Sequence, residues 1–138
     1  MIIGLGTDLI EIHRVRQALR RNREPFLQRV LSESEQQIAA QFADEARLAE
    51  FVAGRFAAKE AIAKATGLGL GKLGMSTVSI RVGETGLVTE WSDISGLVEV
   101  AGHMQQPSAR LHVSLSHAAG VAYAVAILEQ LEQAPRLS

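Results

Sequence analysis

Residues 48–66 (LAEFVAGRFAAKEAIAKAT) constrain the fold more than any other part of the chain. When they are placed about 100° apart around a helix axis, the larger apolar side chains form one stripe and small residues fill the opposite face. The stripe holds Leu48, Phe51, Val52, Phe56, Ile62 and Ala63, and the small face holds Ala53, Gly54, Ala57, Ala58, Ala61 and Ala65. Because small residues let another backbone approach closely, we expect a helix that is covered on most sides.

The same helix carries charges that folding alone does not require. Glu60 and Lys64 are spaced i,i+4 and can pair with each other. Arg55 and Lys59 have the same spacing, but both are cations. Buried charges are costly unless they are paired or bind something charged. An anion between the two cations, a distant acid, or stems that reach the surface would each account for them.

Asp8 raises the same question in the apolar, β-prone segment at residues 1–12. Aspartate is disfavoured inside strands, and by alternation Asp8 shares a face with Gly4, Gly6 and Ile10. A solvent-facing position near the strand end is the simpler interpretation. Together with Glu60, however, Asp8 becomes a candidate site for a hard cation, because Mg²⁺ is usually held by one or two carboxylates plus substrate phosphates.

Two further segments have polar residues that could contact a nucleotide. In HVSLSH, His112, Ser114 and Ser116 share one strand face, which is either simply hydrated or a row of donors for phosphate or ribose. GLGLGK at 67–72 lacks the spacing of a phosphate-binding P-loop and indicates only a glycine-rich loop beside a site.

A basic, amphipathic helix is expected just after residue 12. Its apolar stripe comprises Ile12, Val15 and Leu19, and five arginines fall within ten residues: Arg14, Arg16, Arg20, Arg21 and Arg23. These arginines form either a solvated face or a surface for an acidic partner. Nucleic acid is a poor candidate for that partner, because the whole chain has a net charge of −1 and only 4% aromatic residues.

The order of the expected elements predicts an α+β fold with a mostly antiparallel sheet and a long packed helix. Helices are expected from residue 12, after the Ser32–Glu35 capping box, and over residues 44–66, where Gly67 is a usual stop signal. Strands are expected at 1–12, 76–82, 86–91, 110–116 and 121–129, with one more helix at 93–104. The 138 residues suggest a single domain, 1–138, with a frayed tail from about residue 130.

Composition excludes several classes of protein. The absence of cysteine rules out a disulfide scaffold, a thiol nucleophile and a Cys-ligated zinc. No apolar run approaches the roughly 20 residues that span a bilayer, and the N-terminus lacks the basic region of a signal peptide. We therefore expect a cytoplasmic protein with no membrane partner.

Three segments, IGLGTDLIEI, RFAAKEAIAKATGLGLG and HVSLSH, together resemble the holo-[acyl-carrier-protein] synthases, which are short, single-domain 4′-phosphopantetheinyl transferases. FLQRVLSESE at 26–35 matches the same family more loosely. The matches follow the family's order and cover most of the chain. The resemblance implies the family's fold and reaction. In that reaction a serine of apo-acyl carrier protein attacks the β-phosphate of coenzyme A, and adenosine 3′,5′-bisphosphate leaves.

The resemblance also implies roles for individual residues. The family's Mg²⁺ ligands correspond to Asp8 and Glu60, and its lysine near the reacting phosphates corresponds to Lys64. Arg55 and His112 match positions around the phosphates of coenzyme A, with Arg55 on the 3′-phosphate, and Ser116 of the same strand is a further cofactor-binding candidate. The role of Lys59 stays open, with a structural role one possibility.

Assembly and partners follow from the same resemblance. It implies a homotrimer with active sites between subunits, and an acidic acyl carrier protein as partner for Arg14 and Arg21. A broader transferase for polyketide or peptide carrier domains, and a non-catalytic trimeric nucleotide-binding module, are the alternatives. The chain departs from the family pattern at Gly86-Leu87-Val88 and at Ala118-Ala119-Gly120. The serine proton could be removed by a metal-bound water, by Glu60 or by an acid on the carrier protein.

Overall fold

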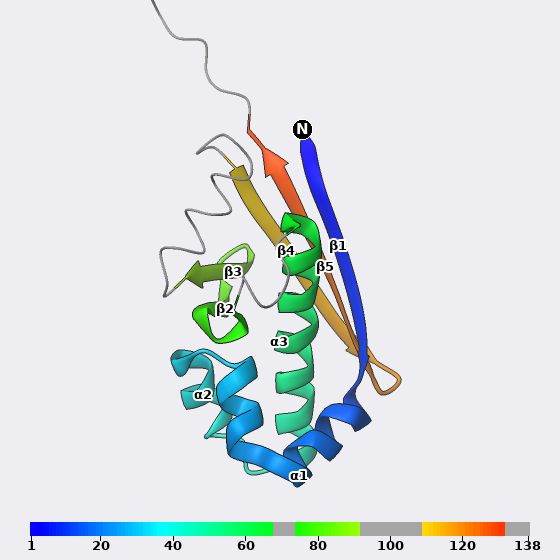
Figure 1. Cartoon of the computed structure of the whole chain (residues 1–138), viewed down its shortest axis with the longest axis vertical. Coiled ribbons are helices and arrows are strands. Elements are labelled where there is room, and N and C mark those ends of the chain that lie inside the picture. The colour runs from blue at the N-terminus through cyan, green and yellow to red at the C-terminus, as the bar shows by residue number, and fades with distance from the viewer. Residues whose placement is uncertain (68–73, 92–108, 132–138) are drawn as a thin grey trace, which may run out of the picture.

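A three-stranded antiparallel sheet and one long helix packed along it form the frame of the molecule (Figure 1). The computed structural model describes residues 1–67, 74–91 and 109–131. Its strands are β1 (Ile2–Glu11), β2 (Val78–Gly83), β3 (Gly86–Trp91), β4 (Ala109–Ala118) and β5 (Val121–Gln130), and its helices are α1 (Ile12–Val30), α2 (Glu33–Ala39) and α3 (Glu45–Thr66), with a short 3₁₀ turn at Met75–Thr77. The predicted α+β fold with antiparallel strands is confirmed.

The main sheet has the order β1-β5-β4, so the N-terminal strand pairs with the last one described. Asp8 lies opposite Ala124 in this register. The β4–β5 hairpin turns at Ala119 and Gly120, whose φ angles of 51° and 79° are those of a tight hairpin turn. Strands β2 and β3 form a separate two-stranded ribbon around the predicted GETG turn.

Helix α3 lies against the sheet with unusually little side chain between the two backbones. A Cβ atom added at Gly4 would lie 1.9 Å from the carbonyl oxygen of Ala65, and one added at Gly6 would lie 2.0 Å from that of Ala61. Strand β5 also presents small residues to the helix, including Ala124 and Ala126, both fully buried. The glycines of β1 and the alanines of α3 and β5 therefore set how closely the layers approach.

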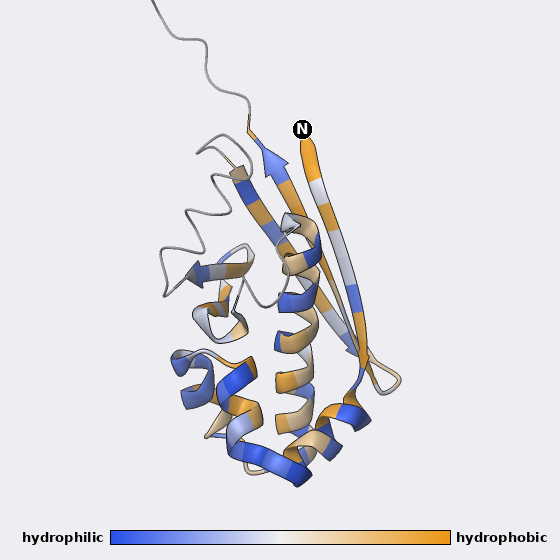
Figure 2. Ribbon diagram, in the orientation of Figure 1, coloured by the Kyte–Doolittle hydropathy of each residue, from blue (hydrophilic) through white to orange (hydrophobic). Residues whose placement is uncertain are grey.

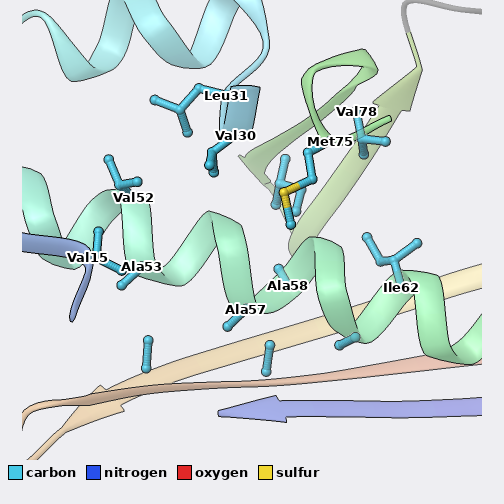
Figure 3. Packing of buried hydrophobic residues seen from close by; sticks show 14 of the residues in the cluster. Val15, Val30, Leu31, Val52, Ala53, Ala57, Ala58, Ile62, Met75 and Val78 are labelled. Carbon is cyan, nitrogen blue, oxygen red and sulfur yellow. The ribbon is translucent and has the colours of Figure 1, made fainter. Parts of the chain in front are cut away.

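The opposite side of α3 is covered by α1, α2 and the β2 region, as Figure 3 shows. There the larger apolar side chains meet: Val30, Leu31, Val52, Ile62, Met75 and Val78. Ala53 and Ala57 lie on the sheet side of the helix. The prediction of a helix covered on most sides is confirmed, and the helix ends as expected at Gly67, which has a left-handed φ of 72°.

Local signals for the other helices are also confirmed. Val15 and Leu19 of α1 are buried, and hydrophilic residues line much of the rest of this helix (Figure 2). Helix α1 is interrupted at Asn22, whose φ of −157° is not helical, shortly before Pro25. The capping box of α2 is complete, because Ser32 Oγ accepts from the Glu35 amide and the Glu35 carboxylate accepts from the Ser32 amide.

Two expectations lie outside the described residues, namely the helix at 93–104 and the tail beyond residue 131. Strand β5 itself continues to Gln130. Among the residues that the structure describes, no helix is long and apolar enough to cross a membrane.

On the sheet face that points away from α3, several large apolar side chains are exposed among the residues that the structure describes. Leu5 and Leu9 of β1 are 63% and 60% exposed, and Tyr123 of β5 is 42% exposed. These side chains alternate with the residues that face the helix, so they share one face of the sheet, which we call the open sheet face.

Replacing Gly6 with alanine tests the close approach of β1 and α3. The added methyl group would collide with the Ala61 carbonyl, so the strand must move away from the helix. We expect the free energy of unfolding in urea to fall by about 3 kcal/mol. The matched control is Thr7→Ala on the exposed face of the same strand, which should cost about 1 kcal/mol or less. Equal effects of the two substitutions would contradict the close contact.

Candidate active site

Asp8, Glu60 and Lys64 come together where β1 passes the C-terminal half of α3. Lys64 Nζ donates to the Thr7 carbonyl oxygen at 2.9 Å and lies 3.4 Å from Asp8 Oδ1. The Asp8 side chain is only 17% exposed, because it is on the strand face that packs against α3. The simpler interpretation of Asp8, a solvent-facing strand end, is therefore not what the structure shows.

The electrostatics of Glu60 indicate that the two carboxylates are neighbours. Partial burial raises the pKa of Glu60, the Asp8 carboxylate raises it further, and Lys64 acts in the opposite direction. The spacing of Glu60 and Lys64 allows them to pair along the helix, but in the structure Lys64 forms its ion pair with Asp8 on the neighbouring strand. Two acids and one cation thus share a small, half-buried site.

The donor set of this site suits a hard cation only in part. Within residues 1–67, 74–91 and 109–131, no cluster of three or more histidine, aspartate or glutamate side chains could hold a metal ion. Asp8 and Glu60 supply oxygen donors from two sides, and the rest of a coordination sphere would come from water or substrate. That is the usual way in which proteins bind Mg²⁺. An open cavity of about 470 Å³ adjoins Lys64, although neither carboxylate belongs to its lining.

The like-charged pair Arg55 and Lys59 is explained by a distant acid, Glu35 of α2. Lys59 is fully buried, and its Nζ donates to Glu35 Oε1 at 2.5 Å and to the Val30 carbonyl at 2.7 Å. Burial lowers the pKa of Lys59, and the Glu35 carboxylate opposes this. Lys59 therefore has a structural role, since removing one partner of a buried ion pair typically costs about 3–5 kcal/mol.

Arg55 borders an open cavity of about 360 Å³ between α3 and β4. Its guanidinium carbon lies 4.5 Å from the centre of the Phe51 ring, and its side chain is 13% exposed. Arg47 and His117 also line this cavity, as does Glu50. Sequence reasoning did not propose Arg47, Phe51 or His117 as site residues, because only the fold places them beside Arg55.

His112 and Ser116 lie elsewhere in this chain. On β4, Leu111, Val113 and Leu115 pack toward the core, so His112, Ser114 and Ser116 belong to the other face of the sheet. His112 Nε2 is 3.0 Å from Glu129 Oε1 on β5, and this contact lowers the pKa of Glu129. One copy of the chain therefore does not bring His112 and Ser116 to Arg55 or to Asp8.

Four of the six arginines of α1 divide into two groups. Arg16 and Arg20 both reach Glu45 at the start of α3, at 3.5 Å and 2.6 Å, so these two have an internal partner. Arg14 is 75% exposed, with Glu11 at 3.9 Å, and Arg21 is exposed as well. Arg21 also borders a cavity of about 230 Å³ that includes Phe26 and Arg29. An acidic partner would thus meet Arg14 and Arg21 rather than the whole series.

Comparison with known proteins identifies the family of the chain. A sequence model of the 4′-phosphopantetheinyl transferase superfamily matches residues 4–127. A holo-[acyl-carrier-protein] synthase from Geobacillus sp. (strain WCH70) is 40% identical over 131 residues, which cover 95% of this chain and 99% of the relative. A holo-[acyl-carrier-protein] synthase from Staphylococcus haemolyticus is 36% identical, and the match covers 94% of this chain and 98% of that relative.

Solved structures agree with the sequence relatives. A holo-(acyl-carrier-protein) synthase from Bacillus anthracis, in complex with CoA (3′,5′-ADP), superposes with a TM-score of 0.74 at 34% identity, covering 95% of this chain and 99% of that one. The enzyme from Neisseria meningitidis gives a TM-score of 0.79 at 26% identity, covering 94% and 100%. The chain therefore belongs to the 4′-phosphopantetheinyl transferase superfamily and, within it, to the holo-[acyl-carrier-protein] synthase family.

Proposed function

We propose that the chain transfers the 4′-phosphopantetheine group of coenzyme A to a serine of apo-acyl carrier protein. The serine oxygen bonds to the β-phosphorus of coenzyme A, and the bond from that phosphorus to the bridging oxygen breaks. The serine loses its proton, and adenosine 3′,5′-bisphosphate leaves. The observation that carries this proposal is the grouping of Asp8, Glu60 and Lys64 in a chain whose relatives are named for this reaction.

Asp8 and Glu60 would hold the Mg²⁺ ion, as two oxygen donors whose mutual repulsion a cation relieves. When bound, Mg²⁺ neutralises charge that develops on a pyrophosphate. Lys64 places a second positive charge at the same point, and its bonds to Thr7 and Asp8 keep the ammonium group from turning away. Electrostatic stabilisation by groups already in position is how phosphoryl transfer is usually accelerated.

Arg55 would bind a phosphate of coenzyme A, and we propose that this is the 3′-phosphate. The support is a cation beside an open cavity, together with a second cation, Arg47, and His117 in its lining. Bidentate hydrogen bonds between arginine and phosphate are strong and directional, so such a contact would fix the nucleotide end of the substrate.

A homotrimer with active sites between subunits accounts for two separate observations. The open sheet face leaves Leu5, Leu9 and Tyr123 exposed, and contact with another copy would bury them. The same face carries His112 and Ser116, which cannot reach Arg55 within one chain. Assembly through this face would bring them to the coenzyme A site of a neighbouring subunit.

The carrier protein would dock on α1, where Arg14 and Arg21 point outward and an acidic helix would complement them. We assign the chain to fatty-acid synthesis, because the names of its relatives specify acyl carrier protein as the protein on which they act. We propose the cytoplasm as the place of this reaction. Two alternative functions remain for the following experiment to distinguish. The substrates could be polyketide or peptide carrier domains, or the chain could bind the nucleotide without turnover.

The direct test mixes the protein with apo-carrier protein, coenzyme A and Mg²⁺ and follows the carrier by mass spectrometry. The carrier of fatty-acid synthesis should gain a phosphopantetheine group faster than a peptide carrier domain. Asp8→Asn and Glu60→Gln should each slow transfer at least about 100-fold, because each removes a charge from the cation site. Glu33→Gln, an exposed acid on α2, is the control and should be as active as the wild type. Full activity of either active-site variant would contradict the metal assignment.

Glu60 should destabilise the folded chain at neutral pH when Mg²⁺ is absent. Burial and Asp8 raise the pKa of Glu60 in the folded state, so the folded protein binds the proton more tightly than the unfolded chain. Stability therefore falls as pH rises from the unfolded pKa through the raised folded pKa. Glu60→Gln should increase the free energy of unfolding at pH 7 and leave it little changed near pH 4. Urea titrations in EDTA at both pH values measure this, and a gain independent of pH would contradict the charge account.

Reversing the charge at Arg14 and Arg21 tests carrier docking. Surface charges act mainly on the encounter rate and are screened by salt. The double variant Arg14→Glu/Arg21→Glu should raise the KM for carrier protein roughly tenfold at low salt and less at high salt. The KM for coenzyme A, measured in parallel, serves as the internal control and should change less. An unchanged carrier KM in variants of Arg14, Arg16, Arg20, Arg21 and Arg23 would leave this surface without a docking role.

A further inference from the structure

The buried carboxylate of Glu35 faces two cations of α3 in different ways. Lys59 is hydrogen-bonded to Oε1, whereas Arg55 Nε lies 3.6 Å from Oε2. Nε of Arg55 is buried and has no hydrogen-bond partner in the part of the chain that the structure describes. Because Nε is buried, the small exposed fraction of Arg55 belongs to the rest of the side chain. Arg55 is thus held from the Glu35 side and borders the 360 Å³ cavity on the other.

Three hydrogen-bond donors fix Glu35 itself, one at the start of its own helix and two from β2 and α3. Its Oε1 accepts from the Ser32 amide at the start of α2 at 2.9 Å, and its Oε2 accepts from the Ile80 amide of β2 at 3.0 Å. Lys59, which also binds the carbonyl of Val30 at the end of α1, completes the set. The carboxylate is 1% exposed, and both of its oxygens accept hydrogen bonds. A group so constrained can set the position of a neighbour.

We infer that Glu35 is a positioning residue for coenzyme A, which orients the Arg55 guanidinium toward the phosphate that Arg55 binds. This inference rests on the proposed function. Glu35 attracts the inner side of the guanidinium, while Phe51 supports its flat face at 4.5 Å. The outer nitrogens are then left for a ligand in the cavity. Groups held in place by such supporting contacts bind with less loss of conformational freedom.

The charge balance of the cluster agrees with an anionic ligand. Two cations, Arg55 and Lys59, share one carboxylate, so the cluster has one net positive charge in a largely buried place. Arg47 adds a cation to the cavity lining, and Glu50 adds an anion. A phosphate bound at Arg55 would compensate the remaining charge.

Positioning and simple attraction predict opposite results for Glu35→Gln. This substitution raises the charge of the cluster from +1 to +2, so attraction alone would lower the KM for coenzyme A. Loss of positioning would instead raise that KM. Because Glu35→Gln leaves the buried Lys59 unpaired and can prevent folding, a second variant is required. Glu35→Gln/Lys59→Met restores the charge of +1 and removes the buried ion pair, a change that proteins often tolerate.

The experiment measures kcat and KM with coenzyme A and with 3′-dephospho-coenzyme A, at saturating carrier protein. We expect Glu35→Gln/Lys59→Met to raise the KM for coenzyme A roughly tenfold, with a smaller effect on kcat, and to change the KM for the dephospho form less than twofold. In an Arg55→Ala background the same pair of substitutions should have no further effect on the KM for coenzyme A. Thermal melting of each variant confirms that it is folded.

The outcomes distinguish this inference from the function on which it rests. If the wild type transfers phosphopantetheine and the double variant keeps the wild-type KM for coenzyme A, Glu35 has only a structural role and the inference is wrong. An equal rise in KM for both forms of coenzyme A would also overturn it, because the effect would not pass through the 3′-phosphate. Absence of transfer by the wild type would overturn the proposed function and the inference together.

Discussion

The close contact between the backbones of β1 and α3 is the constraint on which the rest of the structure depends. Gly4 and Gly6 have no side chains to separate the strand from the carbonyl oxygens of Ala65 and Ala61. Asp8, two residues further along the same strand face, is therefore brought against Lys64 of the helix and into the electrostatic range of Glu60. A bulkier strand would hold these groups apart, and no cation site could form between them.

The charges of α3 serve two different sites because the helix is covered on two sides. Glu60 and Lys64 meet β1 in the candidate cation site, whereas Arg55 and Lys59 meet Glu35 under α2. The first group is partly exposed and can reach a substrate. In the group around Glu35, Lys59 is fully buried and Arg55 borders a cavity. In the proposed function, one helix therefore carries two residues of the cation site as well as the arginine that binds a phosphate of coenzyme A.

The elements of the fold could be predicted from the sequence wherever the signal is local. The Ser32–Glu35 capping box, the stop at Gly67 and the apolar stripe of α1 all lie within a few residues and were confirmed. The partners of the buried charges could not be predicted, because they are distant in sequence: Glu35 and Lys59 are 24 residues apart, and Asp8 and Lys64 are 56 apart. Likewise, nothing in the sequence showed that Arg16 and Arg20 bind Glu45.

The most direct test of this account is a titration of the Glu60 carboxyl group by NMR, in the wild type and in Asp8→Asn, without divalent cations. Burial and Asp8 together raise the pKa of Glu60, so the account predicts a value above the ordinary one in the wild type. Removing the charge of Asp8 should move the pKa of Glu60 back toward the ordinary value. The increase in pKa that burial causes should remain. An ordinary pKa in the wild type that Asp8→Asn leaves unchanged would contradict the claim that one chain places these two carboxylates together.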